Sequence, residues 1–209
     1  VAINRLAVTL TTQEAITEPY LYSFAFDDDN DRSDGPVAIV SSTTIPNGVV
    51  GGSFTVLVQY QNGQYSAYRR TALANGGERL DRALQAFVTV PTSPTGRTLS
   101  FTLDLDARTV SGERLFDPAA TELNTNFITT TERRLDPNDN RRKSFDAFGP
   151  GQPAAYTTFE IGPASRYTYT NSTSVGEPAN DVDNPDFSSL IKVKQLDITN
   201  FTIDVRRSN

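Results

Sequence analysis

Apolar side chains alternate with polar ones along much of this chain, and this two-residue rhythm constrains the fold more than any other feature. It is clearest at Tyr20, Tyr22, Phe24 and Phe26, which fall on one face of an extended segment. The pattern predicts a half-buried strand. Because phenylalanine at alternate positions needs burial, we expect this face to lie in a core, with a sugar-stacking platform as the alternative.

The same alternation recurs in short runs that are separated by turn residues. The strongest turn signal is Asn62-Gly63, because both residues tolerate the positive φ angles of a tight hairpin; it predicts that residues 53–60 pair with residues 65–70. A bulge near Asn200 is needed to reconcile the two phases of the last run. The other predicted strands cover residues 5–10, 98–105, 125–129, 156–161 and 190–205.

Two segments break this rhythm. The apolar residues between 79 and 87 recur at helical spacing and predict a two-turn amphipathic helix, with a strand over residues 84–90 as the alternative. Asp117-Pro118 predicts an N-cap followed by about one helical turn. The whole pattern predicts an all-β, antiparallel β-sandwich of jelly-roll or immunoglobulin-like topology, with at most two short helices, long irregular loops and a single domain over residues 1–209.

The composition excludes several classes of function. Cysteine, methionine, tryptophan and histidine are all absent, which removes thiolate nucleophiles, imidazole bases and the zinc, copper and haem sites that need them. The net charge of −6 repels phosphate backbones, so we expect no nucleic-acid partner. Four glutamates, Glu113, Glu122, Glu132 and Glu160, stand singly in polar contexts and give little support to a glycosidase. We therefore predict that the protein is not an enzyme.

The sequence also gives indications of the cellular location of the protein. No apolar run approaches the roughly 20 residues that a transmembrane helix needs, so we expect no membrane span in it. Val1 in place of an initiating methionine suggests a processed or trimmed start. This favours an exported protein, whether periplasmic, on the cell surface or secreted, and leaves open an anchor upstream of Val1.

An acidic loop follows the aromatic stripe directly. It holds Asp27, Asp28, Asp29, Asp31 and Asp34 within eight residues. These carboxylates repel one another unless water, arginine or a cation shields them, and calcium takes six to eight oxygen ligands. An EF-hand is rejected because no glutamate stands at the twelfth position. The loop therefore predicts either a looser, structural calcium site or a solvated acidic turn paired with arginines.

The aromatic stripe with its Tyr-x-Tyr-x-Phe-Ala-Phe-Asp pattern, the acidic loop that ends in Asp34-Gly35-Pro36, and the Asn-Gly hairpin carry a family resemblance. Together they resemble family 9 carbohydrate-binding modules and related DOMON-like domains of exported bacterial proteins, best over residues 20–70 and loosely over residues 97–130. The resemblance implies a sandwich and structural calcium held by Asp27, Asp29 and Asp31, to which we add Asp34 from the same loop. That family grips sugar between tryptophans, which this chain lacks, so sugar binding is not implied.

The sequence contains several weaker candidates for binding sites. Tyr156, Tyr167 and Tyr169 lie near predicted loops and are candidate ligand-facing aromatics. The long irregular segments 133–155 and 171–187 offer surface for a protein partner. Two further acidic clusters are candidate calcium sites: Asp136, Asn138, Asp139 and Asn140, and separately Asp181, Asp183 and Asp186.

These observations favour one function over another. We predict a non-catalytic, exported sandwich that acts as an accessory or interaction subunit of a cell-surface or periplasmic protein assembly. The alternative is a calcium-dependent carbohydrate-binding module. Calcium is the only cofactor that the sequence indicates.

Overall fold

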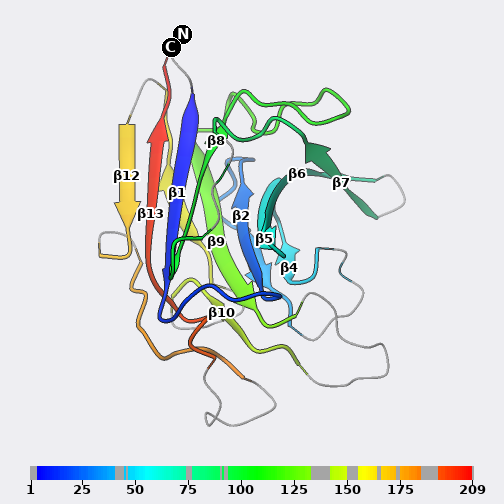
Figure 1. The fold of residues 1–209 in the computed structure, drawn as a ribbon. Coiled ribbons are helices and arrows are strands. Elements are labelled where there is room, and N and C mark those ends of the chain that lie inside the picture. Colours follow the sequence, from blue (N-terminus) through cyan, green and yellow to red (C-terminus); the bar gives the residue numbers. More distant parts are fainter. Residues whose placement is uncertain are drawn as a thin grey trace.

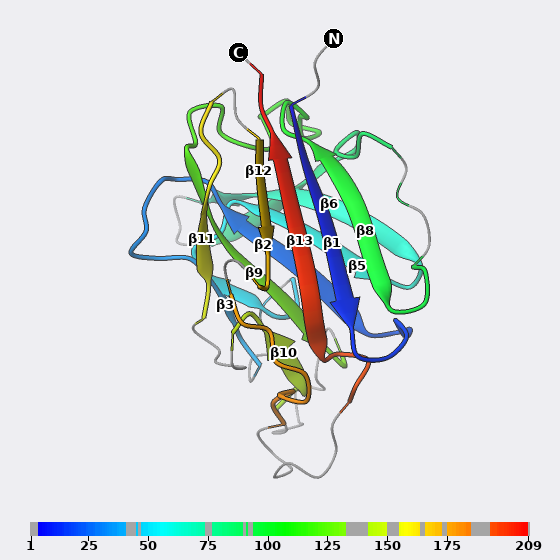
Figure 2. The same cartoon turned by 90° about the vertical axis from the view of Figure 1, so that its left-hand side faces the viewer.

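The computed structural model describes residues 4–40, 45, 47–73, 77–89, 91, 94–132, 142–149, 155–163, 166–172, 175–184 and 193–208. Two antiparallel sheets pack face to face as a sandwich that does not close into a barrel (Figures 1 and 2). The all-β sandwich prediction is confirmed. Over the ranges just given, no helix is long and apolar enough to cross a bilayer.

The smaller sheet has four strands in the order β12-β13-β1-β8 and faces the viewer in Figure 2. Its strands are β1 (Arg5–Thr12), β8 (Thr98–Asp104), β12 (Arg166–Thr170) and β13 (Ile198–Arg206). The first and last strands of the chain are therefore neighbours, with Val8 opposite Ile203, and both termini lie at the same end of the molecule.

The larger sheet has seven strands in the order β10-β9-β2-β5-β6-β7, with β11 also paired to β9. A separate two-stranded sheet consists of β3 and β4. The strands of these two sheets are β2 (Leu21–Asp27), β3 (Pro36–Ala38), β4 (Val50–Gly52), β5 (Val56–Gln61), β6 (Gln64–Ala72), β7 (Glu78–Ala83), β9 (Glu122–Thr130), β10 (Phe145–Ala147) and β11 (Thr157–Glu160).

Aromatic rings fill the space between the two large sheets. Phe24 of β2 meets Phe101 of β8 edge to face, with ring centroids 4.9 Å apart. Phe127 of β9 lies 6.0 Å from Phe201 of β13 in a similar arrangement. Edge-to-face pairs at this separation are favourable, so these rings join the two layers. The prediction that the aromatic stripe lies in the core is confirmed.

Strand β2 is buried on both faces, which corrects the prediction of a half-buried strand. Its second face carries Leu21 and Ala25, which belong to a second hydrophobic cluster together with Ala38 of β3 and Val50 of β4. The small β3–β4 sheet thus covers the outer face of the larger sheet. Local alternation could not reveal this cover, because it comes from a separate part of the chain.

The predicted turn and bulge are both confirmed. Asn62 and Gly63 adopt positive φ angles of 51° and 76°, and Gln61 pairs with Gln64 across the β5–β6 hairpin. In the pairing of β1 with β13, Thr11 lies opposite Asn200 but Thr12 lies opposite Ile198. This bulge lets both phases of the last strand face the core.

Both predicted helices are wrong. Residues 78–83 form the edge strand β7, in which Leu80 pairs with Arg70 of β6 and packs against the second hydrophobic cluster. Residues 117–120 form a turn, in which Asp117 Oδ1 accepts a hydrogen bond from the Ala119 amide at 2.8 Å. The segment 133–155, expected to be irregular, contains β10. For residues 78–83 and for β10, pairing with a neighbouring strand outweighs the local preference.

Candidate metal centre

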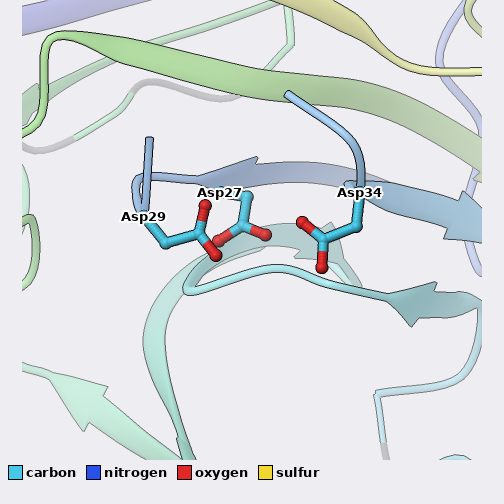
Figure 3. A group of neighbouring side chains, drawn as sticks. All are labelled: Asp27, Asp29 and Asp34. Carbon is cyan, nitrogen blue, oxygen red and sulfur yellow. The ribbon is translucent and has the colours of Figure 1, made fainter. Parts of the chain in front are cut away.

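Three carboxylates converge where β2 ends. Asp27 is the last residue of β2, and Asp29 and Asp34 follow in the acidic loop; Figure 3 shows their side chains directed toward a common space. One carboxylate oxygen from each lies within 4.8 Å of the others. Two oxygens bound to one calcium ion lie at most about 5 Å apart, so this spacing suits a shared cation. We call Asp27, Asp29 and Asp34 the outer cluster.

Asp27 is the decisive member of the outer cluster. The residue is only 3% exposed, and its buried Oδ2 has no hydrogen-bond partner among the residues that the structure describes. The pKa of Asp27 is raised to about 7, mainly by burial and to a smaller extent by the negative charges of Asp29, Asp34 and Asp28, against an opposing effect of the Asp28 amide. A buried, unpartnered carboxylate is costly unless it holds a proton or meets a cation.

The scaffold around the outer cluster holds the acidic loop in place. Asn124 of β9 donates from its side-chain amide to the backbone carbonyls of Asp31 and Asp34, both at 2.5 Å. Ser53 Oγ donates to Asp34 Oδ2 at 2.7 Å. The Tyr156 ring packs so closely on Gly35 that a Cβ there would lie 2.7 Å from it, which requires glycine at this position. The carboxylates are thus positioned before any ion arrives.

The other two aspartates of the loop have different partners. Asp28 is buried, accepts a hydrogen bond from the Asp117 amide at 2.5 Å and lies 3.5 Å from Arg69 Nη1. Asp31 is exposed, and its Oδ1 accepts hydrogen bonds from the Ser33 amide and hydroxyl at 2.8 and 2.6 Å, which lowers its pKa. Asp31, a predicted ligand, is therefore not part of the group that the structure brings together.

A second carboxylate group lies inside the molecule. It consists of Asp146 of β10 with Glu177 and Asp181, and one oxygen of each lies within 4.8 Å of the others. We call these three residues the inner cluster. Of the three, only Asp181 was predicted from the sequence, and no local signal points to Asp146 or Glu177. Its companion Asp183 pairs through its backbone with Phe145, and its pKa is raised by burial.

The remaining predicted acidic residues, Asp136, Asn138, Asp139, Asn140 and Asp186, lie outside the described residues.

The predicted aromatic residues fall into two places. Tyr156 lies beside the acidic loop and donates a hydrogen bond to the Arg32 carbonyl at 3.2 Å. Tyr167 and Tyr169 stack on β12, at the edge of the smaller sheet, with centroids 6.1 Å apart. The Tyr169 ring packs 4.6 Å from Phe159, and its hydroxyl donates to the Glu160 carbonyl at 2.6 Å. Tyr156 is thus the one of the three beside a candidate site, and ligand contact stays a prediction for all three.

Comparison with known proteins adds no relative: no family model, no curated protein and no solved structure matches the chain. The resemblance to family 9 modules therefore stays a prediction.

Proposed function

We propose that this protein is a non-catalytic, calcium-stabilised interaction module of an exported or cell-surface assembly. The observation that carries the proposal is the buried Oδ2 of Asp27, which finds no hydrogen-bond partner in the described part of the chain and stands beside the carboxylates of Asp29 and Asp34. A cation between these groups would cancel their repulsion and satisfy the orphaned oxygen at once.

The donor set favours calcium over other metals. All three side chains offer only carboxylate oxygens, which suit hard cations, and the acidic loop supplies backbone carbonyls and access for water as further ligands. A site with three carboxylates, two of them exposed, resembles the weak sites of extracellular modules, whose dissociation constants are on the order of 10⁻⁴ to 10⁻³ M. Such a site fills in an exported protein, where calcium is abundant.

The bound ion would stiffen a surface rather than take part in a reaction. The exposed residues of the acidic loop, Arg32 and Ser33 among them, follow directly from the ligands. Arg32 is already oriented by Glu122, at 2.5 Å from its Nε. An ordered loop loses less entropy when it docks, so calcium would raise the affinity for a protein partner. This is how a non-catalytic module could depend on calcium.

Isothermal titration with calcium chloride tests the metal site. Asp27→Asn keeps the shape of the side chain but removes its charge, and Asp31→Asn is the matched control, because Asp31 lies on the same loop outside the cluster. We expect D27N to bind one calcium ion fewer than the parent protein, and D31N to bind the same number. Equal binding by D27N and the parent would refute the metal component.

The interaction component needs a separate test. Chemical cross-linking in the native envelope, followed by identification of the linked protein, should give a product with the parent and with D31N. The same product should weaken with D27N and in the presence of a calcium chelator. Recovery of only the free monomer from all three proteins would argue against an interaction module.

Calcium-dependent carbohydrate recognition is the second candidate, and the place of Tyr156 favours it. Its ring lies against Gly35 of the acidic loop, where an aromatic face could accompany a metal-bound sugar. Binding to a glycan array that chelator abolishes, and that Tyr156→Ala also abolishes, would support this candidate. If the protein binds no glycan on the array in the presence of calcium, carbohydrate recognition is ruled out.

A further inference from the structure

The inner cluster lies at the end of the sandwich opposite the chain termini, where β10 is drawn in Figures 1 and 2. Asp146 is fully buried and Glu177 is 7% exposed. A fourth carboxylate, Asp197, is also fully buried just before β13, and its negative charge acts on both Asp146 and Glu177. Four acidic side chains from three separate parts of the chain thus share one region, in which only Asp181 of the four is partly exposed.

The contacts of Asp146 and Asp197 hold this region together. Asp146 Oδ1 accepts a hydrogen bond from the Ala147 amide at 2.9 Å, and its Oδ2 accepts one from the Ile198 amide at 2.6 Å. Asp197 Oδ2 accepts one from the Asn180 amide at 2.7 Å. Since a carboxylate oxygen has two lone pairs, each of these oxygens keeps capacity to bind an ion. The carboxylates are therefore fixed in place by the backbone.

Glu177 gives an independent indication that a ligand belongs here. Both of its carboxylate oxygens are buried, and within the described ranges neither has a hydrogen-bond partner of good geometry. The pKa of Glu177 is raised to about 10, mainly by burial and to a smaller extent by the negative charges of Asp146, Asp181 and Asp197, with a partial offset from the Gly149 amide. Native proteins rarely leave a buried carboxylate in this state without a compensating group.

We propose that Asp146, Glu177 and Asp181 bind a second calcium ion in the interior, with Asp197 contributing charge, and that this ion ties the two sheets together. The ligands come from β10 of the larger sheet and from the segment 175–184, while Asp146 also holds the first amide of β13 in the smaller sheet. The ion acts as a cross-link at the base of the sandwich.

The chemistry of the donors selects calcium. Carboxylate oxygens without any nitrogen or sulfur donor suit hard cations and disfavour zinc. Magnesium dehydrates reluctantly and keeps several waters, whereas calcium accepts an all-protein site with irregular geometry. Up to four negative charges around one ion give strong attraction in a buried region.

The inner site is separate from the outer one and goes beyond the proposed function. In the β9 register, Asp27 pairs with Asn124 and Asp146 pairs with Thr129, so five residues separate the two positions. At about 3.3 Å per residue this is roughly 17 Å, too far for the two clusters to share an ion. Each site can therefore be removed without the other.

Native mass spectrometry and isothermal titration with calcium chloride test the proposal on the full chain. We expect two ions on the parent protein and one on Glu177→Gln, which keeps the shape of the side chain. Asp183→Asn is the matched control, because Asp183 is a partly buried neighbour outside the cluster, and it should keep two ions. Anomalous diffraction from crystals soaked in terbium chloride should give a peak among Asp146, Glu177 and Asp181.

Other outcomes of these experiments would contradict an inner calcium site. Two ions on E177Q, or no anomalous peak at the inner cluster, would mean that these carboxylates share protons instead and would overturn the proposal. If E177Q does not fold, Asp181→Asn takes its place with the same expectations. An ion lost in D27N but not in E177Q or D181N would leave the proposed function standing and remove only the inner site.

Discussion

The outer and inner clusters offer the same chemical groups at the same spacing but are assembled in opposite ways. The members of the outer cluster follow one another within residues 27–34, whereas those of the inner cluster come from residues 146–181. In the outer cluster two of three carboxylates are exposed, while Asp146 and Glu177 of the inner cluster are buried. The sequence can concentrate charge locally, but only the tertiary fold can desolvate it.

This difference in solvent access has a functional consequence. An ion at the outer cluster can exchange with bulk calcium, so the acidic loop can respond to changes in concentration. An ion at the inner cluster is enclosed when β10, the segment 175–184 and β13 meet, so its binding is coupled to folding. We therefore expect the outer site to regulate and the inner site to stabilise.

The largest expected effect comes from removing both sites together. At a calcium concentration about 100-fold above the dissociation constant, each site stabilises the fold by about 2.7 kcal/mol, or roughly 5 kcal/mol for both. Because the clusters are well separated, these contributions should add. The double variant Asp27→Asn with Glu177→Gln should lose nearly all of this stabilisation, measured by urea unfolding with and without chelator. If the double variant keeps half of the stabilisation by calcium, other residues must bind the ions.

A pH series in chelator should separate the clusters. A carboxyl group whose folded pKa is raised holds its proton longer in the native state than in the unfolded state, so stability falls as pH rises toward the folded pKa. For Asp27 this loss begins near the unfolded pKa of about 4 and is complete near 7, and for Glu177 it continues to about 10.

The variants Asp27→Asn and Glu177→Gln should therefore gain stability over the parent protein in different pH windows. The advantage of D27N should grow to at most about 4 kcal/mol and level off near pH 7, while that of E177Q keeps growing above it. Urea unfolding across the series measures both. Identical profiles would mean that the two environments do not differ.

A change in the scaffold should affect only one cluster. Asn124→Ala removes the amide that holds the Asp31 and Asp34 carbonyls and the oxygen that accepts from Thr158 Oγ1 at 2.6 Å. We expect a loss of about 1–3 kcal/mol in the free energy of unfolding, because buried polar groups lose their partners. The outer ion should be lost and the inner ion kept, by native mass spectrometry. Loss of both ions would show that the sites are coupled.

The smallest effect is expected at Asp31. Asp31→Asn weakens the hydrogen bonds to Ser33 on an exposed loop, so the urea midpoint of unfolding should stay close to that of the parent protein. Calcium binding should not change in calorimetry. If D31N binds one calcium ion fewer, Asp31 is a ligand, as predicted from the sequence.

The sequence anticipated the parts of the fold that depend on neighbours along the chain. The Asn62-Gly63 turn and the bulge at Asn200 follow from local backbone preference and from the phase of apolar residues, and both are present. The helix predicted over residues 79–87 is wrong because that prediction also used only local information. Their local spacing indicates a helix, but pairing with β6 decides the outcome.

The outer cluster was predicted in part. The run of aspartates is visible in the sequence, but the choice among them is not, because Asp28 turns to Arg69 and Asp31 turns to Ser33. Asn124 can hold the acidic loop only because β9 lies beside β2. The same arrangement brings Asp34 to Asp27. The inner cluster left no local signal at Asp146 or Glu177.

Side-chain alternation and turn preferences act over a few residues, so they are enough to predict short antiparallel strands, an aromatic core and an acidic loop. The cover on both faces of β2, the position of β1 beside β13 and the meeting of buried carboxylates at the base follow from tertiary packing alone. Burial and charge repulsion depend on which distant segments come together, and that information lies in the packing of the whole chain.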